Sequence, residues 1–139
     1  KAVREALKSG LIDVIATDHA PHHTDEKIVE FDKAPFGIIG LQTLVPLTLK
    51  LVNEGVISLE RMVELTSRNA AKMLNLKDKG RLAEGMLADL AVIDPEIEYV
   101  YDEKINRSKS INSPLFGKKL KGAATTTIKS GKIVYEFGK

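Results

Sequence analysis

The sequence predicts an α/β fold that gives way to a short all-β region. Up to about residue 78, segments with helical spacing of apolar residues flank a short apolar run, as in a parallel α/β unit. From Lys79-Gly80 onward, short apolar segments are separated by glycines, which indicates strands and tight turns. This change predicts two structural units, residues 1–78 and 79–139.

The first elements are a helix and a strand. Residues 2–9 have helical spacing, and Gly10 is expected to end the helix. The apolar run Leu11–Thr17 is typical of a buried parallel strand. Residues 18–37 then form a long polar loop, and loops of this length inside compact domains are usually functional or disordered.

Three helices follow the loop. Residues 40–53 are strongly amphipathic, and Pro46 predicts either a kink or a late start. Ser58 is expected to cap the second helix without the Glu three residues later that would complete a capping box. A third helix, capped by Ser67 or Asn69, is expected to end near residue 76.

The β region is expected to contain four strands and one well-defined turn. Ser130-Gly131 predicts a tight hairpin turn between the last two strands. Residues 102–122 show no clear element and are expected to form a loop. The expected strands are residues 87–94, 97–101, 123–130 and 132–137.

Composition excludes several classes of function. The chain has no cysteine, which excludes disulfides, thiolate metal sites and a cysteine nucleophile, and suits a cytoplasmic protein. No apolar run approaches the roughly 20 residues that span a bilayer, so no membrane association is expected. The net charge is +2, and the basic cluster at Lys118, Lys119 and Lys121 lacks interleaved aromatics. It is therefore interpreted as a solvated face rather than a nucleic-acid site.

The end of the predicted strand carries the chemistry. Asp18 stands beside His19, His22 and His23, which are all the histidines in the chain. In α/β proteins ligands and metals bind at the carboxyl ends of strands, so Asp18 is a candidate metal ligand or general base, although it could instead cap a loop. His19 is expected to point away from Asp18, and His23 to be a surface residue. The adjacent His22 and His23 would splay apart, so we expect no complete metal site within the chain.

Two further segments are candidates of lower specificity. Residues 34–43 end the long loop and begin a helix. The free backbone N–H groups at a helix N-terminus favour anionic ligands. The geometry of a loop leading into a helix could equally explain the pattern. Residues 80–92 carry two glycines and an acid, Asp89, inside an apolar strand. This second segment is interpreted as structural, with Asp89 a satisfied acid.

Taken together, these motifs resemble the C-terminal third of the dihydroorotases, a family of cyclic amidohydrolases. The diagnostic pair is Asp18-His19-Ala20-Pro21-His22 with Ala34-Pro35-Phe36-Gly37. Gly40-Leu41-Gln42-Thr43 follows this pair at the expected distance. Later motifs, shared more widely among cyclic amidohydrolases, complete the resemblance: Lys79–Gly85 with Ala88-Asp89-Leu90, Ser113–Gly117 with Leu120-Lys121-Gly122, and Thr127–Tyr135.

The resemblance implies a fold and a reaction. Residues 1–78 would be the C-terminal part of a (β/α)₈ barrel, with strand 8 at residues 11–17, and residues 79–139 the C-terminal strands of a small β-sandwich. The family interconverts N-carbamoyl-L-aspartate and dihydroorotate with the help of Zn²⁺. By resemblance, Asp18 binds zinc and shuttles a proton, His22 binds the substrate carboxylate, and Phe36 and Gly37 offer backbone groups to the ring.

The same resemblance implies that the site is incomplete. A barrel takes about 250 residues, and the other ligands of the family's metal site are missing from this sequence. The chain is therefore expected to be a fragment that is inactive alone and prone to self-association through exposed apolar surface. The complete protein is expected to form a possible homodimer or to associate with aspartate transcarbamoylase. Two alternatives stay open: another cyclic amidohydrolase such as an allantoinase or dihydropyrimidinase, or a non-catalytic dihydroorotase-like subunit that scaffolds aspartate transcarbamoylase.

Overall fold

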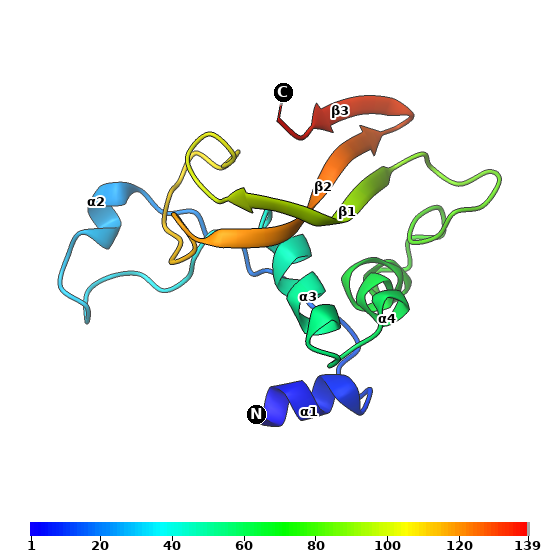
Figure 1. Ribbon diagram of the computed structural model, residues 1–139, viewed down its shortest axis with the longest axis horizontal. Helices are drawn as coiled ribbons and strands as arrows, with labels where there is room; N and C mark the ends of the chain where they lie inside the picture. The colour runs from blue at the N-terminus through cyan, green and yellow to red at the C-terminus, as the bar shows by residue number, and fades with distance from the viewer. Residues whose placement is uncertain (139) are drawn as a thin grey trace.

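The protein has a mixed α/β fold in which helices lie on one side of a small antiparallel sheet (Figure 1). The computed structural model describes residues 1–138. Helix α1 (Ala2–Lys8) lies at the end of the molecule farthest from the sheet, and α3 (Leu44–Asn53) lies between them. The four-residue helix α2 (Thr24–Lys27) projects to one side within the long loop. No helix of the described residues is long and apolar enough to cross a membrane.

The sheet contains three strands in the order β1-β2-β3, namely β1 (Leu90–Val100), β2 (Lys119–Lys129) and β3 (Lys132–Glu136). The predicted strands 87–94 and 97–101 are in fact one strand, because the chain continues through a bulge between Asp94 and Glu98. Pro95 lies in this bulge, where its missing N–H breaks no ladder bond. Strand β2 also begins within the predicted loop 102–122, at Lys119, because those residues pair with the end of β1.

The hairpin turn between β2 and β3 is confirmed. Ser130 and Gly131 both have positive φ, at 49° and 77°. Two consecutive residues in this region form the primed turn whose twist matches that of the flanking strands. Lys129 pairs with Lys132 directly across the turn.

Helix α3 begins later than residue 40, which is the second of the two outcomes that Pro46 predicts. Because Pro46 lies in the first turn of the helix, its missing N–H removes no intrahelical bond. The helix packs against β2 at Gly122, where a Cβ would lie 2.2 Å from the Leu49 side chain. Leu49 joins Leu7, Ile57, Met62 and Leu65 in a single buried cluster.

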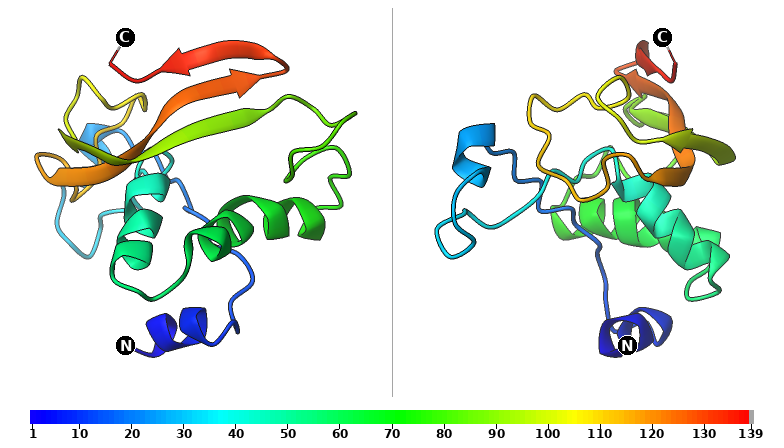
Figure 2. Two further views of the ribbon diagram at one scale, coloured as in Figure 1. Left: turned by 45° about the vertical axis from the view of Figure 1, so that its right-hand side comes forward. Right: turned by 60° about the vertical axis from the view of Figure 1, so that its left-hand side comes forward.

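The second and third predicted helices are one continuous helical segment (Figure 2, left). It consists of α4 (Leu59–Val63), the π-helical turn η1 (Glu64–Arg68) and α5 (Asn69–Met73). Ser58 caps it by accepting a hydrogen bond from the N–H of Arg61 at 3.1 Å, as predicted. The expected break between two helices at Ser67 or Asn69 is wrong. The helical backbone continues through these residues, because Glu64–Arg68 forms a π turn that leads directly into α5.

Leu11–Thr17 forms no strand among the described residues, contrary to prediction. A strand needs a neighbour for its ladder, and residues 1–138 supply none here. The continuous helix binds the segment instead. Arg61 donates to the Ile12 carbonyl and Asn69 to the Asp13 carbonyl, each at 2.8 Å, and Ile15 N–H donates to the carbonyl of Leu65 in the π turn at 2.9 Å.

Asp89 is a satisfied structural acid, as the sequence predicts. Its carboxylate accepts hydrogen bonds from the side chains of Lys129 and Lys79 and from the backbone N–H of Ser130. Lys129, then Lys79 and the Ser130 N–H, hold the pKa of Asp89 well below its usual range. This clamp joins the linker before β1 to the β2–β3 turn.

Candidate active site

Asp18 lies at the end of the segment that the continuous helix binds. Its side chain is exposed, and its φ is +45°, a conformation that L-residues rarely adopt and that Asp tolerates better than most. Within residues 1–138 its carboxylate has no hydrogen-bond or ion-pair partner. A strained backbone carrying an unpaired carboxylate motivates a functional hypothesis for Asp18.

His22 is held in a fixed orientation by the loop that follows. Its Nε2 lies 2.8 Å from the carbonyl oxygen of Phe36. Since a carbonyl only accepts, Nε2 carries a proton, and Nδ1 faces Glu26 Oε2 at 3.6 Å. The His22 side chain is 22% exposed, so its ring is partly covered while remaining accessible.

Phe36 and Gly37 contribute backbone rather than side-chain contacts. Phe36 is 95% exposed and its carbonyl is bound by His22, while the Gly37 carbonyl accepts from Lys27 Nζ at 2.9 Å. Among the described residues, the N–H groups of Phe36 and Gly37 donate to no acceptor. Gly37 has φ +98°, and a Cβ there would lie 2.5 Å from that of Ala20. Only glycine therefore permits this close approach of the two ends of the long loop, residues 18–22 and 35–40, here called the two site loops.

The other two histidines have structural contacts. His19 Nδ1 accepts a hydrogen bond from the N–H of Gly40 at 3.1 Å, which ties the end of the loop to the start of the α3 region. His23 caps α2 in a reciprocal arrangement with Glu26, and its side chain is 74% exposed. The prediction that His23 is a surface residue is confirmed.

Sequence analysis missed Asn112, which joins both site loops. Its side-chain amide donates to the Ala20 carbonyl at 2.8 Å and to the Gly37 carbonyl at 3.3 Å, and its Oδ1 accepts from the His22 N–H at 3.4 Å. Asn112 lies in the stretch predicted as a featureless loop. A polar residue next to the Ser113–Gly117 motif was the one available signal, and it does not identify a partner about 90 residues away.

The described residues do not form a complete metal site. They contain no group of three or more His, Cys, Asp or Glu side chains that could hold an ion. Asp18 fits as one ligand, because its carboxylate is exposed and unpaired, whereas His19, His22 and His23 are each engaged elsewhere. Any metal centre that Asp18 joins needs ligands from outside these residues.

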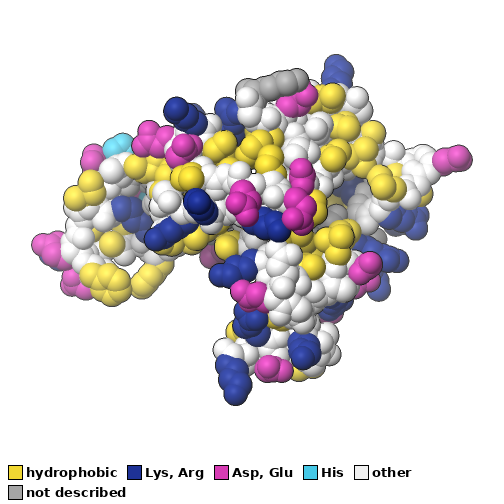
Figure 3. All heavy atoms as spheres, viewed as in Figure 1, with side chains coloured by type: hydrophobic (Ala, Val, Ile, Leu, Met, Phe, Trp, Pro, Cys, Tyr) yellow, Lys and Arg dark blue, Asp and Glu magenta, His cyan; other side chains and the backbone are white. Residues whose placement is uncertain are grey.

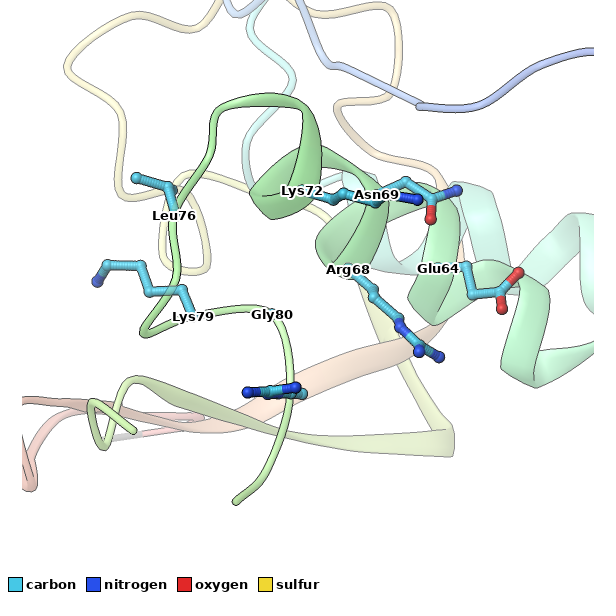
Figure 4. Close-up of a pocket in the computed structure, with 8 residues that line it drawn as sticks. Glu64, Arg68, Asn69, Lys72, Leu76, Lys79 and Gly80 are labelled. Atoms are coloured by element: carbon cyan, nitrogen blue, oxygen red, sulfur yellow. The ribbon is translucent and has the colours of Figure 1, made fainter. Parts of the chain in front are cut away.

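Two hollows among the described residues lie beside these residues rather than on them. One of about 160 Å³ is lined by His19 and Gln42 together with residues of the 102–118 loop. Another, of about 430 Å³, lies between the continuous helix and the chain around Gly80 (Figure 4) and contains none of the predicted site residues. Its cationic side chains do not converge on one point, since Lys72 and Lys79 point in different directions in Figure 4.

Comparison with known proteins places this chain. Residues 1–134 match the amidohydrolase family. The chain is 52% identical to the dihydroorotase of Geobacter metallireducens over 135 residues, which are 97% of this chain and 32% of that protein. It is 47% identical over 136 residues to the dihydroorotase of Endomicrobium trichonymphae, again 32% of that protein. The chain thus spans about a third of the length of these relatives.

Solved structures agree with the fold. The L-hydantoinase (dihydropyrimidinase) from Arthrobacter aurescens superimposes with a TM-score of 0.89 at 36% identity, covering 99% of this chain and 32% of that one. The dihydropyrimidinase from Brevibacillus agri gives 0.88 at 26% identity, covering 97% and 31%. The family match covers nearly the whole sequence, and these likenesses extend it to three dimensions: the chain belongs to the amidohydrolase family.

Proposed function

We propose that the chain is the C-terminal third of a dihydroorotase, which interconverts N-carbamoyl-L-aspartate and dihydroorotate in pyrimidine biosynthesis. The observation that carries the proposal is the pairing, on one short loop, of the unpaired Asp18 carboxylate with the oriented His22 ring. The names of the relatives at about 50% identity support it. The complete enzyme here means a protein of the relatives' length that contains this chain.

In the complete enzyme, Leu11–Thr17 is the eighth strand of a (β/α)₈ barrel, and residues 79–139 belong to a small β-sandwich. The continuous helix already holds one side of this segment through Arg61, Asn69 and Leu65. Its apolar side chains remain only partly covered, and Leu11 is 79% exposed. Strand neighbours from outside the chain would cover them and would place Asp18 at the carboxyl end of the barrel, where such enzymes carry their sites.

Asp18 is proposed to ligate one zinc ion and to move a proton. When bound, zinc lowers the pKa of its water and polarises the scissile carbonyl. The Asp18 carboxylate, which nothing in residues 1–138 neutralises, takes the proton of the attacking water and delivers it to the ring nitrogen as the amide bond breaks. The remaining ligands lie outside this chain.

His22, Phe36 and Gly37 are proposed to bind the substrate. His22 Nε2–H is already donated to Phe36, so the ring binds the substrate carboxylate through a protonated Nδ1, on the side that Glu26 now faces. As an imidazolium it supplies both the charge and the donor. The free N–H groups of Phe36 and Gly37 are donors suited to the carbonyl oxygens of the ring.

Replacing His22 tests the proposal against the neighbouring activities of the family. Loss of one charge-assisted hydrogen bond predicts that His22→Ala in the complete enzyme raises KM for dihydroorotate about 10- to 100-fold. His23→Ala is the matched control, because that side chain is exposed and is expected to leave KM unchanged. An unchanged KM for His22→Ala would favour an uncharged cyclic substrate, as in the dihydropyrimidinases whose structures this chain resembles.

A further inference from the structure

Residues 102–118, here called the late loop, connect β1 to β2 and reach back to the candidate site (Figure 1, yellow to orange). We propose that Asn112 of this loop is a positioning residue of the active site, which fixes the position of the His22 backbone relative to that of Gly37. The proposal rests on the function proposed above, because the two residues it positions are the proposed substrate-binding groups.

Asn112 forms hydrogen bonds through the nitrogen and the oxygen of its side-chain amide and through its backbone carbonyl. The amide nitrogen donates to Ala20 and Gly37, one residue on each site loop, and Oδ1 accepts from the N–H of His22. Its backbone carbonyl accepts from the N–H of Ile39 at 3.1 Å. One side chain therefore bridges two backbone segments that are also joined by the Ala20–Ile38 hydrogen bond of 3.0 Å, by the contact between His22 and Phe36, and by the His19–Gly40 hydrogen bond.

The chemistry of this bridge requires an amide. The Ala20 carbonyl needs a donor and the His22 N–H needs an acceptor, and a short asparagine side chain supplies both. The same amide adds a second donor to the Gly37 carbonyl, which Lys27 also binds. An aspartate keeps the acceptor and loses both donors, while adding a negative charge beside the proposed site of a substrate carboxylate. An alanine loses all three contacts and leaves the backbone bond to Ile39 intact.

The same loop has a second attachment that avoids the site. The Gln42 side chain donates to the carbonyl of Ile105 at 2.7 Å and accepts from the backbone N–H of Arg107. Gln42 therefore fastens the late loop to the start of the α3 region without touching His22 or Gly37. It is the matched control, because its removal loosens the loop and leaves the Asn112 contacts in place.

The activity test compares three variants in the complete enzyme. Asn112→Ala is expected to raise KM for dihydroorotate about tenfold, with kcat within about threefold of wild type and zinc content unchanged, because the contacts orient binding groups and not Asp18. Asn112→Asp is expected to raise KM further. Gln42→Ala is expected to keep KM within about twofold. An unchanged KM for Asn112→Ala, or an equal rise for Gln42→Ala, overturns the proposal.

Amide hydrogen exchange gives a readout that is independent of turnover. Asn112→Ala is expected to speed exchange at the N–H of His22 and Ala20, whereas Gln42→Ala is expected to speed it only in the late loop. Unchanged exchange at His22 and Ala20 in Asn112→Ala overturns the positioning role. If the wild-type enzyme failed to turn over dihydroorotate, the proposed function would fall, and exchange would decide by itself whether Asn112 joins the loops.

Discussion

The sheet and the segment Leu11–Asp18 satisfy their backbones in different ways. In the sheet, three antiparallel strands pair with one another, and the Asp89 clamp fixes the turn to the preceding linker. Leu11–Asp18 has the apolar composition of a central strand and pairs with no strand of the described residues. It is fastened by side chains and one carbonyl of the continuous helix, and it ends in a carboxylate without a partner.

This difference shows which parts of the fold are local. A hairpin needs only its own two strands and turn, whereas a parallel strand needs neighbours that come from elsewhere in the chain. Apolar side chains reach the surface in several places (Figure 3). They include Leu11, which is 79% exposed, and also Ile133 and Val134 of β3, each 61% exposed. The region expected to carry the chemistry is the region that pairs with no strand of residues 1–138.

The largest expected effect concerns the isolated 139-residue chain. Supplied with Zn²⁺ and dihydroorotate, it is expected to show no turnover, because its described residues contain no complete metal site. Its exposed apolar surface is also expected to make it self-associate, which light scattering would detect. Normal turnover by the monomeric chain would contradict the view that Asp18 depends on outside ligands.

Gly37→Ala tests the close approach of the two site loops. The new Cβ would lie 2.5 Å from that of Ala20 at a positive φ, so we expect a local cost of about 2–4 kcal/mol and a raised KM for dihydroorotate. The measurements are the thermal unfolding midpoint and steady-state kinetics of the complete enzyme. Gly55→Ala is the matched control: its φ is +66° but its Cβ would meet nothing within 4 Å, so about 1 kcal/mol is expected.

Asp89→Asn tests, through its pH dependence, how much the Asp89 clamp stabilises the sheet. The folded-state pKa of Asp89 lies below the ordinary value of about 3.9, so its contribution to stability is complete above that value and is lost as pH falls through the lowered one. The gap in unfolding midpoint between wild type and Asp89→Asn is therefore expected to be full at pH 7 and to shrink below about pH 4. Asp78→Asn, an exposed neighbour in the same linker, should show a smaller gap; equal gaps would argue against the clamp.

Local patterns predicted the local parts of the fold. The Ser130-Gly131 turn, the Ser58 cap and the late start at Pro46 each follow from a few adjacent residues, and each is confirmed. The strand predicted at residues 11–17 is wrong for residues 1–138, because no described strand lies beside this segment to pair with its backbone. The π turn at Glu64–Arg68 joins two segments that sequence spacing separates, and spacing alone cannot show it.

The candidate site was also predictable only where neighbouring residues in the sequence reveal it. Asp18 and His22 stand out because the three histidines of the chain cluster beside one acid. The contact of His22 with Phe36 spans 14 residues, and Asn112 acts from about 90 residues away. Such contacts depend on how the late loop folds back, which no periodicity encodes.

Replacing Asp18 in the complete enzyme tests the central claim most directly. Asp18→Asn preserves size and tolerates positive φ while removing the charge that would bind metal and accept the proton. We expect kcat for dihydroorotate to fall about 10³-fold or more with an unchanged unfolding midpoint, a scale set by general-base contributions of about 10²–10⁴ together with the lost metal ligand. Asp13→Asn, an exposed acid on the same segment, is expected to retain wild-type turnover. Near-normal turnover by folded Asp18→Asn would contradict the account.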